Sequence, residues 1–345
     1  MLWEPHDPRQ ALDERFGFSD EKSAGRWVAA MLDEHWGVRV ETCERIVMSD
    51  GNALAWVGTP SGRLIAKWSV VPERFPRLAQ TARLTGWLHD RGLPVSAPVP
   101  ARGGRLQVEA GRVSMGLQRE IMGELLNTAD LDQVRASGAL LAELQSALAA
   151  YPHADQLPAL AGSSEPLTAR VTAWLGSRAG HLPAAARDTL RDLVAGAPPD
   201  RLARQLVHFD FRSANILVAD GKVAAVLDFE ETQHDHPLVE LARAAILLGT
   251  RYHNWGPVPA DVRAEFVAGY QSVRPLTEAE ARWLDILLLW QALAMVPPGD
   301  DPTGWGPSAL RQLTRALIIQ ADLQPVPGAR SRVESRSRRR AGGAR

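Results

Sequence analysis

Four hydrogen-bonding side chains lie within eight residues of one another, between two apolar segments. In the stretch LVHFDFRSAN (206–215) they are His208, Asp210, Arg212 and Asn215. A second aspartate, Asp228, ends the next apolar segment. Carboxylate and amide oxygens are ligands that Mg²⁺ prefers, and Mg²⁺ usually shares such sites with water and substrate phosphates. These residue types therefore indicate chemistry on a metal-bound phosphate, provided that the fold brings them together.

A β-hairpin is the element that would bring them together. The stretch ILVADGKVAAVL (216–227) contains two apolar segments joined by Ala-Asp-Gly, a strong signal for a tight turn. Folding the chain at Asp220–Gly221 places Asn215 beside the end of the second strand, and cross-strand neighbours lie within about 4.5–8 Å. We therefore expect Asn215 and Asp228 to converge at the open end of the hairpin, with Asp210 one loop earlier.

The spacing of the motif resembles that of a known family. His-x-Asp-x-x-x-x-Asn followed by Asp-Phe-Glu is similar to the pattern of the aminoglycoside and choline kinase phosphotransferases, which share the protein-kinase fold. The resemblance spans about residues 45–295. It implies an enzyme that uses ATP and Mg²⁺ to transfer the γ-phosphate to a hydroxyl group of a small molecule. A simple Asx-turn would explain the His-x-Asp pair alone, but not the complete pattern.

The resemblance also implies a role for each residue of the cluster. Asp210 would orient the acceptor hydroxyl or accept its proton, and His208 would structure the catalytic loop. Arg212 would place a positive charge near the transferring phosphate. Asn215 and Asp228 would bind Mg²⁺.

One lysine in an apolar segment is a candidate for phosphate binding. Lys67 lies in RLIAKWSVV and is one of only three lysines in a chain with 36 arginines. A strand lysine that extends its amine to solvent is the simpler explanation. However, a chain that uses arginine for general positive charge favours a specific role for Lys67. Lysine is a compact charge suited to the α/β-phosphates, which is where the resemblance places it.

Two further segments would complete the nucleotide site, according to the resemblance. Residues 48–58 would form a hairpin that covers the phosphates, with Ser49, Gly51 and Asn52 at its tip. The segment that links the lobes would offer backbone groups to adenine. These backbone groups belong to Gln118, Arg119 and Glu120.

The sequence departs from the family at the partner of the lysine. The family usually has a glutamate in the small-lobe helix, but Gln80 and Thr81 occupy the matching positions here. We expect either Glu73, the nearest glutamate, or Asp228 to orient Lys67 instead. This departure leaves open a non-catalytic nucleotide-binding protein. A kinase of peptide or protein substrates is a second alternative.

The order of the segments predicts an α+β fold with two lobes of the protein-kinase type. We expect a helical extension at 1–35, a small β-rich lobe with one helix at 36–118, and a larger, mainly helical lobe at 119–325. A basic tail at 326–345 is expected to be disordered. The helix of the small lobe is expected at about 74–91, and those of the large lobe at about 129–151, 165–195, 238–250, 259–271, 276–297 and 307–323. The hairpin of the motif is the only strand pair expected in the large lobe.

Length, cysteine content and the lack of long apolar segments indicate where in the cell the protein is expected. A length of 345 residues suggests two domains or lobes. The single cysteine, Cys43, excludes an internal disulfide and fits a reducing cytoplasm. The first residues lack a signal-peptide pattern, and the longest apolar segment, 286–296, is shorter than the roughly 20 residues of a membrane span. We therefore expect a cytoplasmic monomer or homodimer without membrane association.

The distribution of charge along the chain indicates which partners and substrates the folded part could bind. The tail 329–345 carries a net charge of +6, so the rest of the chain carries −7. An acidic body argues against nucleic acid as a partner of the folded part and suits a cationic substrate. Glu230 and Glu231 follow Asp228 in a polar loop and are candidates for substrate contacts. The sequence does not identify the acceptor beyond a hydroxyl-bearing small molecule.

Overall fold

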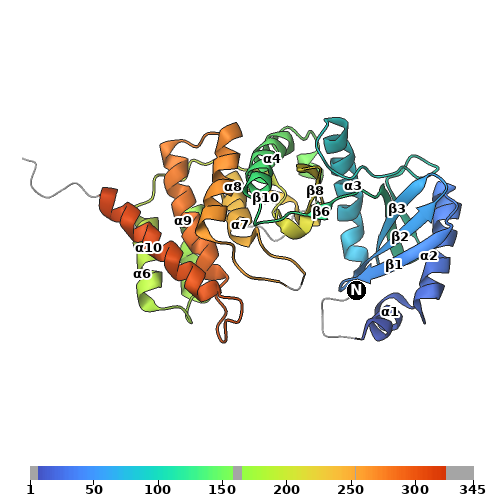
Figure 1. Ribbon diagram of the computed structural model, residues 1–345, viewed down its shortest axis with the longest axis horizontal. Helices are drawn as coiled ribbons and strands as arrows, with labels where there is room; N and C mark the ends of the chain where they lie inside the picture. Colours follow the sequence, from blue (N-terminus) through green and yellow to red (C-terminus); the bar gives the residue numbers. More distant parts are fainter. Residues whose placement is uncertain (1–6, 158–164, 253, 324–345) are drawn as a thin grey trace, which may run out of the picture.

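The computed structural model describes residues 7–157, 165–252 and 254–323. An antiparallel sheet with helices occupies one end of its long axis, and a mainly helical part occupies the rest (Figure 1). The two-lobed α+β architecture that the sequence predicts is therefore confirmed. The basic tail at 326–345 lies outside the described residues.

The small lobe is built on one five-stranded antiparallel sheet. Its strands are, in spatial order, β1 (Thr42–Met48), β2 (Asn52–Thr59), β3 (Gly62–Ser69), β5 (Val113–Arg119) and β4 (Gln107–Ala110). Two helices, α1 (Pro8–Phe16) and α2 (Glu21–Trp36), share a core with this sheet, in which Leu12 and Leu32 join Val57 and Trp68. The helices expected as an N-terminal extension are therefore part of the small lobe itself.

The third helix of the small lobe, α3 (Phe75–Asp90), belongs to a different core. Its residues Leu84 and Leu88 are fully buried in the apolar cluster of the large lobe, and Trp87 packs against that cluster. In Figure 1, α3 stands between the sheet and the helical part. The position of α3 is therefore tied to the large lobe rather than to the sheet alone.

Helices dominate the large lobe. They are α4 (Leu131–Ala149), α5 (Leu167–Ser177), α6 (Ala184–Ala195), α7 (Pro237–Leu247), α8 (Ala260–Val273), α9 (Glu278–Ala294) and α10 (Trp305–Leu323). Short strands accompany them: β6 (Glu124–Leu125), β7 (Gln205–Val207), β8 (Ile216–Ala219), β9 (Lys222–Val226) and β10 (Gln233–Asp235). The apolar segment 286–296 lies mostly in α9 and is largely buried, as expected. No helix in the described ranges is long and apolar enough to cross a membrane.

Two expectations for this lobe were wrong. The segment 165–195 forms two helices, because α5 ends at Ser177 and α6 begins only at Ala184. Gly180 and Pro183 lie between them, and both residue types are unfavourable inside a helix. The hairpin of the motif is not the only strand pair, because β6 pairs with β8 and β7 pairs with β10. These added strands are only two or three residues long, too short for a recognisable alternation.

Two glycines allow α4 and α8 to pack closely. A Cβ atom at Gly138 of α4 would lie 2.0 Å from the carbonyl oxygen of Phe266, and one at Gly269 of α8 would lie 2.0 Å from that of Arg135. Backbone atoms cannot move aside as a flexible side chain can. Both helices therefore require glycine where they meet.

We expect Gly138→Ala to destabilise the protein by about 1–3 kcal/mol, because the added methyl group overpacks the α4–α8 contact. Urea unfolding of the variant and the wild type measures the difference. Gly176→Ala is the matched control, since that helical position has no heavy atom within 4 Å of a built Cβ. Alanine at this open helical position should stabilise by up to about 1 kcal/mol. Equal stabilities for Gly138→Ala and the wild type would contradict the contact.

Candidate active site

His208 organises the loop that follows β7. Its side chain is fully buried, its Nδ1 accepts a hydrogen bond from the Asp210 N–H (3.2 Å), and its Nε2 lies 2.9 Å from the Leu227 carbonyl oxygen. These partners require a neutral ring that donates through Nε2. Burial lowers the pKa of His208, which favours this neutral form. His208 thus connects the Asp210 loop to the residue that precedes Asp228.

The carboxylate of Asp210 is held from two sides. Arg212 Nε donates to its Oδ1 at 2.8 Å, and Asn215 Nδ2 donates to its Oδ2 at 2.7 Å. Asn215 Nδ2 also lies 2.9 Å from the backbone oxygen of Asp210. The structure therefore brings together these three residues of the predicted cluster. Two donors fix the orientation of the carboxylate.

The hairpin brings Asn215 beside Leu227, the residue that precedes Asp228. Its strands β8 and β9 pair with Ile216 opposite Val226, and the Leu227 N–H donates to the Asn215 carbonyl oxygen at 2.8 Å. The two turn residues, Asp220 and Gly221, both have positive φ (51° and 73°), which is the conformation of a type I′ turn.

Lys67 crosses from the small lobe to this cluster. It lies in the middle of β3, and its Nζ is 3.1 Å from Asp228 Oδ1 and also forms an ion pair with Glu230. Burial by itself lowers the pKa of Lys67, but the Asp228 and Glu230 carboxylates outweigh burial, so the pKa is raised. The Lys67 charge in turn lowers the pKa of Asp228. The strand lysine is thus a fixed cation inside the cluster.

The β1–β2 hairpin reaches the same point through Asn52. Its Nδ2 donates to Glu230 Oε2 at 2.9 Å. The tip itself is closed by a bond from the Ser49 N–H to the Asn52 carbonyl oxygen (2.8 Å). A Cβ at Gly51 would lie 2.3 Å from a methyl carbon of Val71, so a side chain there would require Val71 to move. Of the three predicted tip residues, Asn52 is the one that contacts the cluster.

The segment predicted to meet adenine lies at the end of β5. Gln118 and Arg119 are its last two residues, and Glu120 follows. The Arg119 carbonyl oxygen accepts from Ser96 Oγ (2.9 Å), and the Glu120 N–H donates to the Arg63 carbonyl oxygen (3.2 Å). These two backbone groups already have protein partners. The adenine contact of this segment stays a prediction.

Of the two alternatives for the partner of Lys67, the structure supports Asp228. Glu73 is exposed and lies just before α3. Glu230, which the sequence suggested only as a substrate contact, is the second acidic partner. Arg77 of α3 was missed altogether, although it is 8% exposed and donates to the backbone oxygens of Glu230 (2.6 Å) and Thr232.

Helix α7 fixes the strained backbone of the loop 208–215. Phe209 has a φ of 70°, a left-handed conformation that costs free energy for a bulky residue. Glu240 Oε1 accepts from the Phe209 N–H at 2.6 Å, and Arg243 Nε donates to the Phe209 carbonyl oxygen at 3.0 Å. The α7 side chains thus bind both backbone groups of the residue that precedes Asp210.

A chain of buried hydrogen bonds connects Glu240 to α4 and α8. Gln145 of α4 donates to Glu240 Oε2 at 2.7 Å, and the Tyr270 hydroxyl of α8 donates to Gln145 Oε1 at 2.6 Å. Glu240 is 1% exposed, and burial raises its pKa to about 7 although its hydrogen bonds oppose this. A carboxyl group with such a pKa titrates close to neutral pH.

This pKa predicts a pH dependence of stability. The native pKa of Glu240 lies above that of an unfolded glutamate, so the native state is favoured by protonation and loses free energy of unfolding as pH rises from about 4.5 to 7. The loss is of order 2–3 kcal/mol, at about 1.4 kcal/mol per pKa unit. Urea unfolding between pH 5 and pH 8 should show this decrease in the wild type and not in Glu240→Gln. A stability difference between the two that does not change with pH would refute it.

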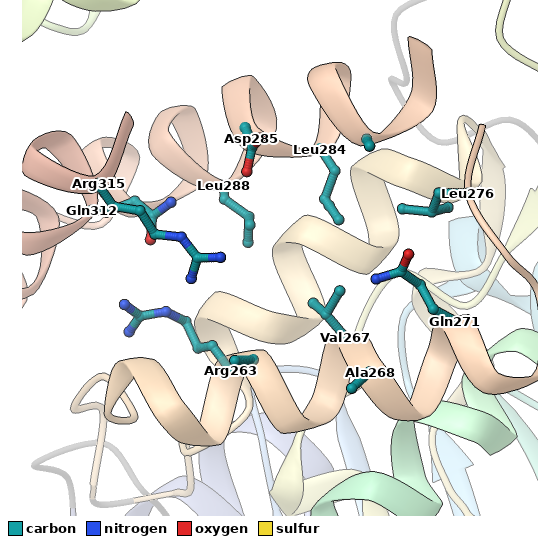
Figure 2. Close-up of a pocket in the computed structure, with 12 residues that line it drawn as sticks. Arg263, Val267, Ala268, Gln271, Leu276, Leu284, Asp285, Leu288, Gln312 and Arg315 are labelled. Atoms are coloured by element: carbon teal, nitrogen blue, oxygen red, sulfur yellow. The ribbon is translucent and has the colours of Figure 1, made fainter. Parts of the chain in front are cut away.

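A hollow in the large lobe is separate from this cluster. A cavity of about 220 Å³ lies between α8, α9 and α10, lined by apolar residues such as Val267 and Leu288 together with Arg263, Asp285 and Arg315. Figure 2 shows these side chains directed into the space between the helices. None of the residues predicted for the catalytic, nucleotide or metal site lines it.

The fold and the candidate site are those expected of the kinase-like phosphotransferases. The chain belongs to the phosphotransferase enzyme family (APH), because residues 49–284, well over half of its length, match that family's model. This membership confirms the resemblance that the motif suggested.

Curated relatives are homoserine kinases. The chain is 31% identical over 207 residues to homoserine kinase of Gluconacetobacter diazotrophicus, an alignment that covers 59% of this chain and 63% of that protein. It is 28% identical over 222 residues to homoserine kinase of Methylobacterium radiotolerans, with 61% and 68% covered. The chain thus spans somewhat less than two thirds of the first of these relatives.

Solved structures with lower sequence identity show the same fold. The macrolide 2′-phosphotransferase of Brachybacterium faecium is similar with a TM-score of 0.57 at 17% identity, over 84% of this chain and 96% of that one. An amicoumacin kinase in complex with AMP-PNP and Ca²⁺ has a TM-score of 0.56 at 14% identity, with 84% and 92% covered. A microcompartment-associated aminopropanol kinase has a TM-score of 0.55 at 19% identity, with 84% and 95% covered.

Proposed function

We propose that this chain transfers the γ-phosphate of ATP, in a Mg²⁺-dependent reaction, to a hydroxyl group of a small molecule. The observation that carries the proposal is the Asp210 carboxylate, held by Arg212 and Asn215 beside the hairpin that presents Asp228. Membership of the phosphotransferase family supports it.

The charged and polar side chains of the proposed site indicate which residues would bind the phosphates and which would bind Mg²⁺. Lys67 is the cation available to the α/β-phosphates, and Asn215 and Asp228 offer the amide and carboxylate oxygens that suit Mg²⁺. This donor set fits the metal, because the Asp228 side chain is 46% exposed and only one of its oxygens is bonded to Lys67. When bound, Mg²⁺ would neutralise charge on the phosphates.

Asp210 would act on the acceptor. Because Arg212 and Asn215 fix its carboxylate, it can accept a hydrogen bond from an incoming hydroxyl and align that oxygen with the γ-phosphorus. Such catalysis is mainly positioning and charge stabilisation. Arg212 lies next to Asp210 and would contribute positive charge near the transferring group. His208 supports the loop from within and does not face the substrate.

We propose homoserine as the first acceptor to test, since the curated relatives are named homoserine kinases. A local charge imbalance also favours an acceptor with an ammonium group. Burial raises the pKa of Glu231, and the nearby Asp210 and Asp228 carboxylates raise it further. A cation bound beside Glu231 would relieve this repulsion.

The missing helix glutamate was the feature that favoured a non-catalytic protein. Lys67 nevertheless has two acidic partners in this structure, Asp228 and Glu230. The absence of a glutamate in α3 therefore does not argue against catalysis.

We expect Asp210→Asn to lower the rate of ATP-dependent phosphorylation by about 10²–10⁴-fold, because the hydroxyl loses its general base. Phosphorylation of L-homoserine and of a panel of amino alcohols and aminoglycosides, followed by mass spectrometry, measures the effect. Asp220→Asn is the matched control, because Asp220 is an exposed turn residue and asparagine accepts its positive φ. Equal rates for Asp210→Asn and Asp220→Asn would remove Asp210 from the mechanism.

A further inference from the structure

Apolar side chains line most of the cavity between α8, α9 and α10. Val267 belongs to α8, Leu276 to the segment that follows it, and Leu284 and Leu288 to α9. The volume of the cavity is about 220 Å³. An apolar cavity of about 150 Å³ is sufficient to bind benzene. This cavity therefore has room for a small apolar molecule that also carries a short polar group.

Two arginines lie at the same end of the cavity. Arg263 of α8 and Arg315 of α10 both line it, and Figure 2 shows them on the side of α10, with Gln271 at the opposite end. Arg263 is 6% exposed, although arginine is rarely buried without a charged partner. Its Nη1 donates to the Val258 carbonyl oxygen at 2.6 Å and lies 3.5 Å from Ser308 Oγ. Its Nε and Nη2 have no hydrogen-bond partner among the described residues, so a buried guanidinium group still has N–H groups to offer.

The positive charge at this end of the cavity is not balanced by an ion pair. Burial lowers the pKa of Arg263, and the charges of Arg311 and Arg315 lower it further, although Asp261 opposes them. Asp285 also lines the cavity, but it forms no ion pair with Arg263 or Arg315 in the part of the chain that the structure describes. An anion bound between the two arginines would relieve their mutual repulsion.

The lining indicates the chemistry of an occupant. The planar fork of an arginine binds a carboxylate through two hydrogen bonds, and the apolar walls favour an uncharged body. The carboxylate of Asp285 disfavours a doubly charged group such as a phosphate monoester. The basic tail 329–345, with its net charge of +6, does not complement two arginines. A small ligand with a single negative charge therefore fits this cavity better than a segment of the tail.

The cavity lies on a different face of α8 from the contacts that support the loop 208–215. Tyr270 donates to Gln145, and the ring of Phe266 lies 6.1 Å from the ring of Phe211. Neither Tyr270 nor Phe266 lines the cavity. A ligand in the cavity would therefore be separated from the candidate active site by the helix itself.

We propose that this cavity is a second binding site, which takes a small monocarboxylate with an apolar body. The carboxylate lies between Arg263 and Arg315, and the apolar body packs against Val267, Leu284 and Leu288. Binding can be measured without catalysis, so the proposal does not depend on the proposed phosphotransferase function. A chain without kinase activity that still binds such a ligand would refute that function and leave this site intact.

Ligand-observed NMR titrations of the whole chain test the chemistry of the ligand. The probes are 3-phenylpropionate and 4-methylpentanoate, which combine a carboxylate with an apolar body. 3-Phenylpropionamide has the same shape as the first probe without the charge, and acetate has the charge without the apolar body. We expect the probes to bind at least about tenfold more tightly than either control, because the bonds to arginine are charge-assisted. Failure of both probes to bind, or equal binding by the amide, would overturn the proposal.

Removal of one guanidinium group tests the charged end. Arg315→Gln should raise the Kd for 3-phenylpropionate about tenfold, equivalent to about 1.4 kcal/mol. Arg311→Gln is the matched control, because Arg311 is exposed on the same helix, one turn earlier, and does not line the cavity. Its Kd should change less than about twofold, since solvent and salt screen an exposed charge. Equal Kd values for the two variants would refute the role of Arg315.

A larger side chain at the apolar end tests where the ligand lies. Val267 points into the cavity, so the ring of Val267→Phe should occupy the space of the ligand and abolish binding (Figure 2). Val273→Phe is the matched control, because Val273 is exposed at the end of α8 and does not line the cavity. Circular dichroism establishes that both variants are folded. An unchanged Kd in folded Val267→Phe would place the ligand elsewhere and overturn the proposal.

Discussion

One ammonium group links the two halves of the candidate site. Lys67 projects from the middle of the small-lobe sheet and meets Asp228 and Glu230 at the end of the large-lobe hairpin. Asn52 and Arg77 bind the same acidic segment from two other elements of the small lobe. The relative position of sheet, helix α3 and hairpin therefore depends on whether the segment 228–232 stays in place.

The loop 208–215 is fixed by an independent set of contacts. Its Phe209 backbone is strained, and α7 holds it through Glu240 and Arg243. The buried chain from Glu240 to Gln145 and Tyr270 adds α4 and α8 as supports. The close packing of α4 and α8 at their two glycines thus supports the loop through Gln145 and Tyr270.

Much of this arrangement could be predicted from the sequence, because the patterns that indicate it lie within short segments of the chain. The Asp220–Gly221 turn fixes the register of the hairpin, and the register places Asn215 next to Leu227, the residue that precedes Asp228. The scarcity of lysine singled out Lys67. The two-lobed fold followed from the change from strand-like to helical segments.

What the sequence did not reveal depends on contacts between distant residues. Arg77 and Glu230 are 153 positions apart, and no local pattern links them. A signal for Arg77 was present, since it shares a helix face with Leu84 and Leu88, where a charged residue needs a buried partner. The short strands β7 and β10 were missed because pairing across the fold, not propensity, defines them.

The division of the apolar cores has a mechanical consequence. Leu84 and Leu88 anchor α3 in the large-lobe core, while α1, α2 and the sheet share a second core. A hinge movement that opens the site would follow this boundary, so the sheet would slide over α3 instead of carrying it along. The rigid bodies of such a motion are then different from the two lobes that the order of the chain suggests.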